Sequence, residues 1–111
     1  MILDPASMTM RHEGQVWAPP RRLWLLVKGM SRRIDRTWEH QELLDMMGSS
    51  ASNPVHVGGQ IKLIRAAFRE RGWPDPILTR VRLGYAWTLP VTLAPMDIAP
   101  AAGADEFRFR S

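Results

Sequence analysis

The sequence predicts a single α+β domain with a small N-terminal antiparallel sheet, three helices and a C-terminal β-hairpin. Three observations lead to this fold class. The chain has 111 residues, which is the length of one domain. Its hydrophobic and charged fractions, 45% and 23%, are those of an ordinary globular protein. Short strand-like stretches, three helical stripes and a second strand-like pair follow one another along the chain.

The N-terminal sheet is predicted from residues 1–17. Asp4-Pro5 and Glu13-Gly14 are turn pairs, and Val16-Trp17 is the last of the short apolar stretches. A small antiparallel meander accounts for this pattern.

Two helices follow, at about residues 20–29 and from His40 to the glycine at position 48. Proline at position 20 suits the first turn of a helix, where its missing N–H has no intrahelical partner. Apolar residues at helical spacing mark the two buried faces: Leu23, Leu26, Val27 and Met30 in the first, and Leu43, Leu44 and Met47 in the second. A brief strand is expected between them at residues 36–38.

The third helix carries one clean apolar stripe, Val57, Ile61, Ile64 and Phe68. Asn53 and Pro54 are good N-cap and first-turn residues, and Gly72 suits the end of the helix. Gly58-Gly59 conflicts with this start, because each internal glycine costs about 1 kcal/mol relative to alanine. A start near Gln60 is therefore the alternative.

Residues 77–89 are predicted to form a hairpin, and the composition changes at Pro90. The domain is thus expected to span residues 1–89, with a Pro/Ala-rich tail at 90–111. In that tail the alternation of Phe107 and Phe109 with arginine can make a short strand against a partner. The five tryptophans are expected mainly in the core, and the three histidines at the surface or at helix caps.

Charge is the first indication of function. Fifteen Lys and Arg oppose eleven Asp and Glu, a net charge of +4, and thirteen of the fifteen bases are arginine. The planar arginine fork offers two parallel donors to phosphate, so nucleic acid leads the partner classes. The absence of cysteine excludes disulfide scaffolds and thiolate metal sites. We expect no enzyme activity, metal or cofactor, because nucleophile–base pairs, phosphate-binding glycine loops and paired carboxylates are missing.

Strands, three helices and a basic hairpin form the order of a winged helix-turn-helix, and particular residues match one family. Its motifs correspond to Glu13-Gly14, Val16-Trp17, Ala18–Leu26, Leu43-Leu44-Asp45, the stripe of the third helix, and the wing spacing Thr79…Gly84-Tyr85. Over residues 1–89 the chain resembles the winged-helix DNA-binding domain of PhoB/OmpR-type response regulators. It departs from the family pattern at Arg22, Gln60 and Ala67.

The resemblance implies a transcriptional regulator that binds double-stranded DNA in a sequence-specific manner. At this length there is no room for a receiver domain, so we expect it to act without one. The third helix would face the major groove, the hairpin the minor groove, and other arginines the phosphates. The expected DNA-binding residues are Gln60, Lys62, Leu63, Arg65 and Arg69 from the helix, Thr79, Arg80 and Arg82 from the hairpin, and Arg21 and Arg36 elsewhere.

Two other functions remain open. One is a protein-interaction module that docks on RNA polymerase, through Gly48–Asn53, or on another regulator. The other is a structural or virion protein that holds nucleic acid without sequence specificity. A homodimer on DNA also remains open. No targeting or membrane segment is visible, so we expect a cytoplasmic, nucleoid-associated protein.

Overall fold

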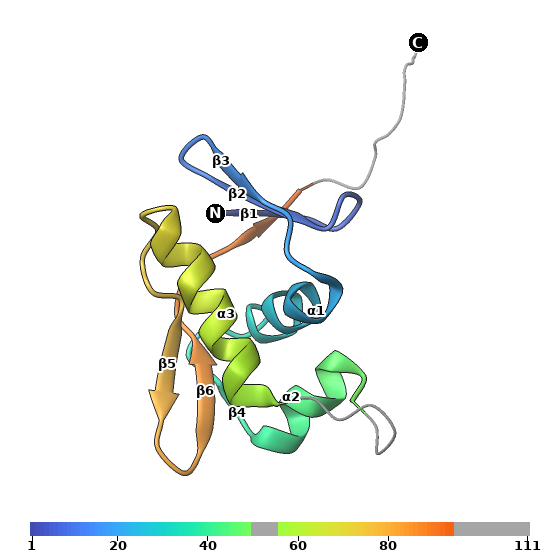
Figure 1. The fold of residues 1–111 in the computed structure, drawn as a ribbon, viewed down its shortest axis with the longest axis vertical. Helices are drawn as coiled ribbons and strands as arrows, with labels where there is room; N and C mark the ends of the chain where they lie inside the picture. Colours follow the sequence, from blue (N-terminus) through green and yellow to red (C-terminus); the bar gives the residue numbers. More distant parts are fainter. Residues whose placement is uncertain (50–55, 95–111) are drawn as a thin grey trace.

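The computed structural model describes residues 1–49 and 56–94, which form two small sheets around three helices (Figure 1). The helices are α1 (Arg21–Met30), α2 (His40–Met47) and α3 (Val57–Glu70). The strands are β1 (Ile2–Asp4), β2 (Thr9–His12), β3 (Gln15–Trp17), β4 (Thr37–Trp38), β5 (Ile77–Arg80), β6 (Gly84–Trp87) and β7 (Thr92–Leu93). The predicted order of strands, helices and hairpin is confirmed.

The first sheet has the strand order β3-β2-β1-β7. Its meander is antiparallel, and Leu3, Met10 and Trp17 pair across it in one row that is buried in the core. β7 is parallel to β1, and its backbone donates from Thr92 to Met1 at 2.9 Å and from Ala94 to Leu3 at 2.7 Å. The sheet therefore includes residues beyond the boundary at Leu89 that the sequence predicts. Residues 95–111, with the expected strand at Phe107 and Phe109, lie outside the described residues.

The second sheet has the order β4-β6-β5 and is antiparallel throughout. Gly84 begins β6 with φ of +141°, and a Cβ there would overlap the backbone carbonyl of Trp38 in β4. Only glycine satisfies both conditions, since L side chains rarely adopt this φ. The close approach of β6 to β4 therefore depends on this residue.

The α3 helix begins earlier than the alternative near Gln60. Val57 is its first residue, and the N-cap is His56, whose Nδ1 accepts the backbone N–H of Gly59 at 3.2 Å. The histidine is thus the cap in place of the expected Asn53, which lies with Pro54 outside the described residues. Gly58 and Gly59 lie within the first turn, where the cap offsets part of their cost.

The core joins all three helices to both sheets. The predicted stripe of α3 is buried, and Phe68 makes edge-to-face contacts with Trp17, Trp73 and Trp87 at centroid distances of 5.1–5.9 Å. All five tryptophans are buried, as the sequence predicts. Among the described residues, no helix is long and apolar enough to cross a bilayer.

Candidate nucleic-acid interface

The outward side of α3 presents few charged side chains. Lys62, Leu63, Arg69 and the acidic Glu70 are exposed there, and Leu63 keeps 54% of its surface accessible. Lys62 and Arg69 are seven residues apart, which is two helical turns, so they share one side about 10 Å apart along the axis. Neither makes an ion pair within the described part of the chain. We call Lys62, Leu63 and Arg69 the α3 face.

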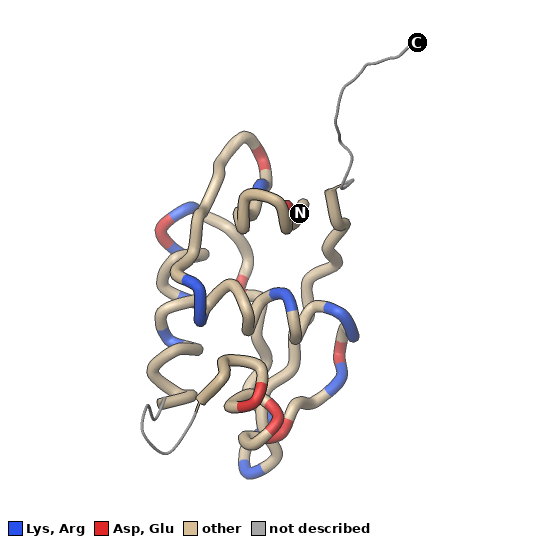
Figure 2. Tube along the Cα trace, turned by 90° about the vertical axis from the view of Figure 1, so that its right-hand side faces the viewer, with Lys and Arg blue, Asp and Glu red and all other residues tan. Residues whose placement is uncertain are grey.

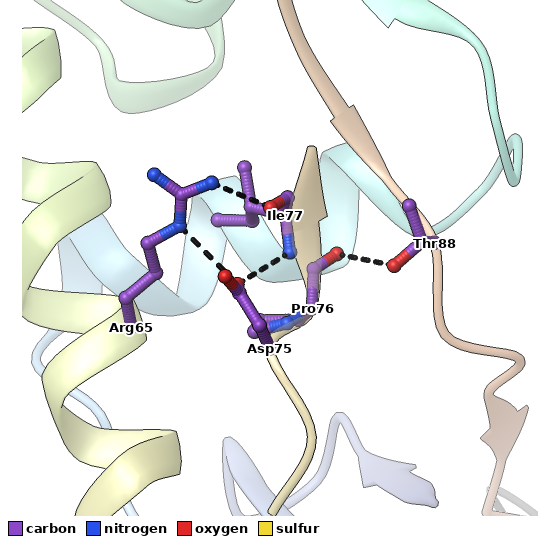
Figure 3. A network of polar contacts seen from close by, with 5 residues as sticks. All are labelled: Arg65, Asp75, Pro76, Ile77 and Thr88. Carbon is purple, nitrogen blue, oxygen red and sulfur yellow. Dashed lines mark hydrogen bonds and ion pairs between the residues drawn. The ribbon is translucent and has the colours of Figure 1, made fainter. Parts of the chain in front are cut away.

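Arg65 occupies a different position from the one expected. Its guanidinium donates to a carboxylate oxygen of Asp75 at 3.2 Å and to the carbonyl of Ile77 at 2.5 Å (Figure 3). The same Asp75 oxygen accepts the N–H of Ile77 at 3.1 Å. Arg65 therefore ties α3 to the start of β5. Gln60 is half-buried at the other flank of the apolar stripe, so neither residue lies on the outward side of the helix.

The wing is the hairpin of β5 and β6, which runs beside α3 in Figure 1. Its turn is closed by a hydrogen bond from the Leu83 N–H to the Arg80 carbonyl at 2.9 Å. Arg82 lies at the tip, exposed, with a left-handed φ of +67°. Such a conformation costs a non-glycine residue about 1 kcal/mol or more. Val81 and Leu83, 78% and 64% exposed, flank it.

Arg80 is held inside the second sheet. One of its nitrogens donates to the Thr37 hydroxyl at 2.6 Å and to the Asp35 carbonyl at 3.3 Å. The side chain therefore reaches across β6 to β4. Thr79 is exposed and lines a shallow hollow of about 440 Å³ beneath the wing, which Glu39 and His40 at the start of α2 also line.

Arg21 and Arg36 lie apart from the α3 face. Arg21 is exposed at the start of α1, and Arg36 is in the loop between α1 and β4. Arg36 pairs with Glu42 at 2.7 Å and lies 3.8 Å from the ring centroid of Trp38. Of the expected residues, Lys62, Leu63 and Arg69 are thus exposed on α3 and Thr79 and Arg82 on the wing, whereas Arg21 and Arg36 belong to α1 and the loop after it.

Comparison with known proteins bears on the fold. No protein-family model and no curated protein matches the chain. Among solved structures it is similar to the DNA-binding domain of Escherichia coli CadC, an OmpR/PhoB-family winged-helix domain. The TM-score is 0.66 at 20% identity, over 78% of this chain and 83% of that chain. The chain therefore has the winged-helix fold that its residues predict.

Proposed function

We propose that the protein is a sequence-specific regulator of transcription that binds double-stranded DNA through the α3 face and the tip of the wing. One observation carries the proposal: unpaired cationic side chains on the outward side of α3 lie next to a hairpin whose tip is an exposed arginine. A helix of this size fits the major groove, and an arginine fits a narrow minor groove.

The roles differ among these residues. Lys62 and Arg69 can donate to guanine edges or to phosphates, and Leu63 can contact a thymine methyl group. Arg82 neutralises the backbone or the minor groove, so it contributes affinity with little sequence preference. Arg65 and Arg80 position α3 and the wing by their internal hydrogen bonds. The similarity to a DNA-binding domain supports this role for the fold as a whole.

The test is a selection of preferred duplexes from a random pool, followed by titration at several salt concentrations. With Lys62, Arg69 and Arg82 on phosphates or bases, the logarithm of the binding constant should fall against that of the salt concentration with a slope of about −3. Lys62→Ala should alter the preferred sequence, whereas Arg11→Ala, which removes a charge from the N-terminal sheet, should not. Absence of duplex binding at low salt would overturn the proposal.

The exposed wing-tip residues favour a second candidate function. Val81 and Leu83 are large, apolar and mostly accessible, as they would be in a surface that docks on another protein. Such a module would bind RNA polymerase or another regulator in a manner that salt weakens little. The segment Gly48–Asn53 expected to contact polymerase is described only at Gly48 and Ser49. The double variant Val81→Ser/Leu83→Ser distinguishes the two functions. If the wing tip docks on a protein, the variant should lose that binding, whereas its affinity for a DNA duplex should stay nearly unchanged.

A further inference from the structure

A second basic surface follows the exposed side of α1 and the loop after it. Arg21 and Lys28 are exposed and seven residues apart, so they share one side of the helix. Arg32 and Arg33, also exposed, continue the row beyond the end of α1. We call these four residues the α1 face. None of them forms an ion pair within the described residues.

The α1 face points away from the α3 face. α1 contacts both α2 and α3, and its other side is buried in the core by Leu23, Trp24, Leu26, Val27 and Met30. Its exposed side chains therefore project away from α3. In Figure 2, α3 borders the molecule on the left, and a row of basic positions crosses the middle along α1 to the loop on the right. A straight duplex seated on α3 leaves that loop uncovered.

A hollow lies at the end of the α1 face that is formed by the loop after α1. Arg32, Arg33, Arg36 and Trp38 line a space of about 340 Å³. The centroid of the Trp38 ring lies 3.8 Å from the guanidinium carbon of Arg36 and 5.8 Å from that of Arg32, so the ring contacts both cations. Arg32 Nε donates to the Gly29 carbonyl at 3.1 Å, so the outer nitrogens of this side chain remain available.

In the described part of the chain, the acidic groups nearby pair with only one of the arginines of this cluster. Glu42 engages Arg36 at 2.7 Å. Asp35 is exposed and makes no ion pair within residues 1–49 and 56–94. Arg32, Arg33 and Lys28 thus form no ion pair within the described residues, whereas Glu42 compensates the charge of Arg36. Such an arrangement is stabilised by an external anion.

The shape of the surface indicates which anion. The basic row extends along a ten-residue helix, about 15 Å, and then through the loop. A single small anion would occupy only the hollow, whereas a nucleic-acid backbone presents charge continuously, about one per 1.7 Å of duplex. We propose that the α1 face binds a second DNA duplex, so that one molecule bridges two duplexes. The proposal rests on the proposed function, which supplies the first duplex.

The test uses one duplex carrying a preferred site, fixed to beads, and a second, fluorescent duplex in solution. The wild-type protein should retain the fluorescent duplex on the beads. Arg33→Gln and the pair Lys28→Gln/Arg33→Gln should reduce retention severalfold while binding the fixed duplex with nearly unchanged affinity. Arg33→Lys should retain bridging, and Arg11→Gln is the matched control for loss of one positive charge elsewhere. Bridging by the wild type should also disappear at lower salt than single-duplex binding.

The outcomes separate the two proposals. Failure to bind even the fixed duplex contradicts the proposed function. Binding of the fixed duplex without capture of the second overturns bridging and leaves the first proposal standing. Capture that survives Lys28→Gln/Arg33→Gln also overturns it, because the second duplex would then be held by another surface or by a second molecule. If the same variant loses the fixed duplex, the α1 face belongs to the primary interface and is no second site.

Discussion

The arginines that the structure describes fall into two groups in the folded protein: some form internal hydrogen bonds, and others are exposed to solvent. The guanidinium groups of Arg65 and Arg80 donate to backbone carbonyls and join secondary-structure elements. Those of Arg69 and Arg82 are exposed at the proposed DNA surface. A hydrogen bond from a charged donor is worth roughly 1.5–3 kcal/mol where it is shielded from water, as in the part-buried bond of Arg65 to Ile77, whereas an exposed cation adds little to stability. Stability and DNA affinity should therefore respond to different arginines.

Arg65 and Lys62 give the clearest contrast. Arg65→Ala removes the link to Ile77 and Asp75, so the free energy of unfolding should fall by about 1–2 kcal/mol in denaturant titrations. Lys62→Ala should leave that free energy unchanged within about 0.5 kcal/mol and weaken binding to a preferred duplex by roughly 1–3 kcal/mol. If Arg65→Ala is as stable as the wild type but prefers a different DNA sequence, Arg65 contacts DNA bases and its internal hydrogen bonds are not what holds α3 in place.

At the wing tip, stability and binding should change in opposite directions. Arg82 has a left-handed backbone that glycine adopts without strain. Arg82→Gly should therefore raise the thermal midpoint or leave it unchanged, while the salt slope of duplex binding becomes shallower by about one. Calorimetry and salt titration of the same preparation check both parts. A steep slope in Arg82→Gly would remove Arg82 from the DNA surface.

In the second sheet, a side chain at position 84 should be strongly destabilising. In Gly84→Ala, the new Cβ meets the Trp38 carbonyl and the backbone has an unfavourable φ. We expect a loss of about 2–4 kcal/mol in the free energy of unfolding. Gly48→Ala is the matched control, because φ is also positive there but the space is open, so its loss should be about 1 kcal/mol. Equal losses would mean that β4 moves freely.

Among the elements, α2 depends on a carboxylate at its start. Glu42 accepts the backbone N–H of Glu39 at 2.8 Å, and its other oxygen pairs with Arg36. The hydrogen bond from Glu39, followed by the one from Arg36, lowers the pKa of Glu42 below its ordinary value. Because the folded state favours the ionised form, this stabilisation is present above the ordinary glutamate range and is lost as pH falls through the lowered pKa.

The consequence is a pH-dependent difference between Glu42→Gln and the wild type. At about pH 7 the variant should melt at a lower temperature, since the amide forms weaker bonds to Glu39 and Arg36. The difference should shrink as the pH is lowered below the ordinary glutamate range and Glu42 of the wild type becomes protonated. Glu70→Gln, at an exposed position that forms no ion pair within the described residues, is the control for the loss of one carboxylate. A difference that stays constant over this range would show that the charge of Glu42 does not contribute.

At the scale of the whole molecule, the strand pairing with the largest separation in sequence joins the two ends of the described chain. β7 lies against β1, while Leu89 and Val91 pack on the core. A chain ending at Leu89 should therefore be about 2–3 kcal/mol less stable than one ending at Ala94, from two backbone hydrogen bonds and the partly buried valine. Denaturant titration of the two chains checks this. Equal stability would restore the predicted boundary at Leu89.

The contrast between local and distant features explains what the sequence could predict. The α3 stripe, Gly48 as the end of α2 and the wing spacing depend on residues close together, so period and turn chemistry reveal them. β7 is two residues long and pairs with a strand about 90 positions away, which no local pattern encodes. Likewise, the ion pair of Arg65 with Asp75 depends on the position that Asp75 takes after the turn that follows α3. The sequence could predict which residue types would serve as candidates for DNA binding. The partners of each side chain could be identified only from the folded structure.

The pairing of β7 with β1 also determines how the domain bears mechanical load. The two strands are parallel, so pulling the chain apart by its ends slides one strand along the other and loads the ladder in shear. The hydrogen bonds between these two strands, among them those donated by Thr92 and Ala94, resist first and are loaded together. The three-helix core lies behind them and takes no tension until they fail. Under the proposed function, a duplex bound to α3 would therefore bear no force transmitted through either terminus until the pairing of β7 with β1 breaks.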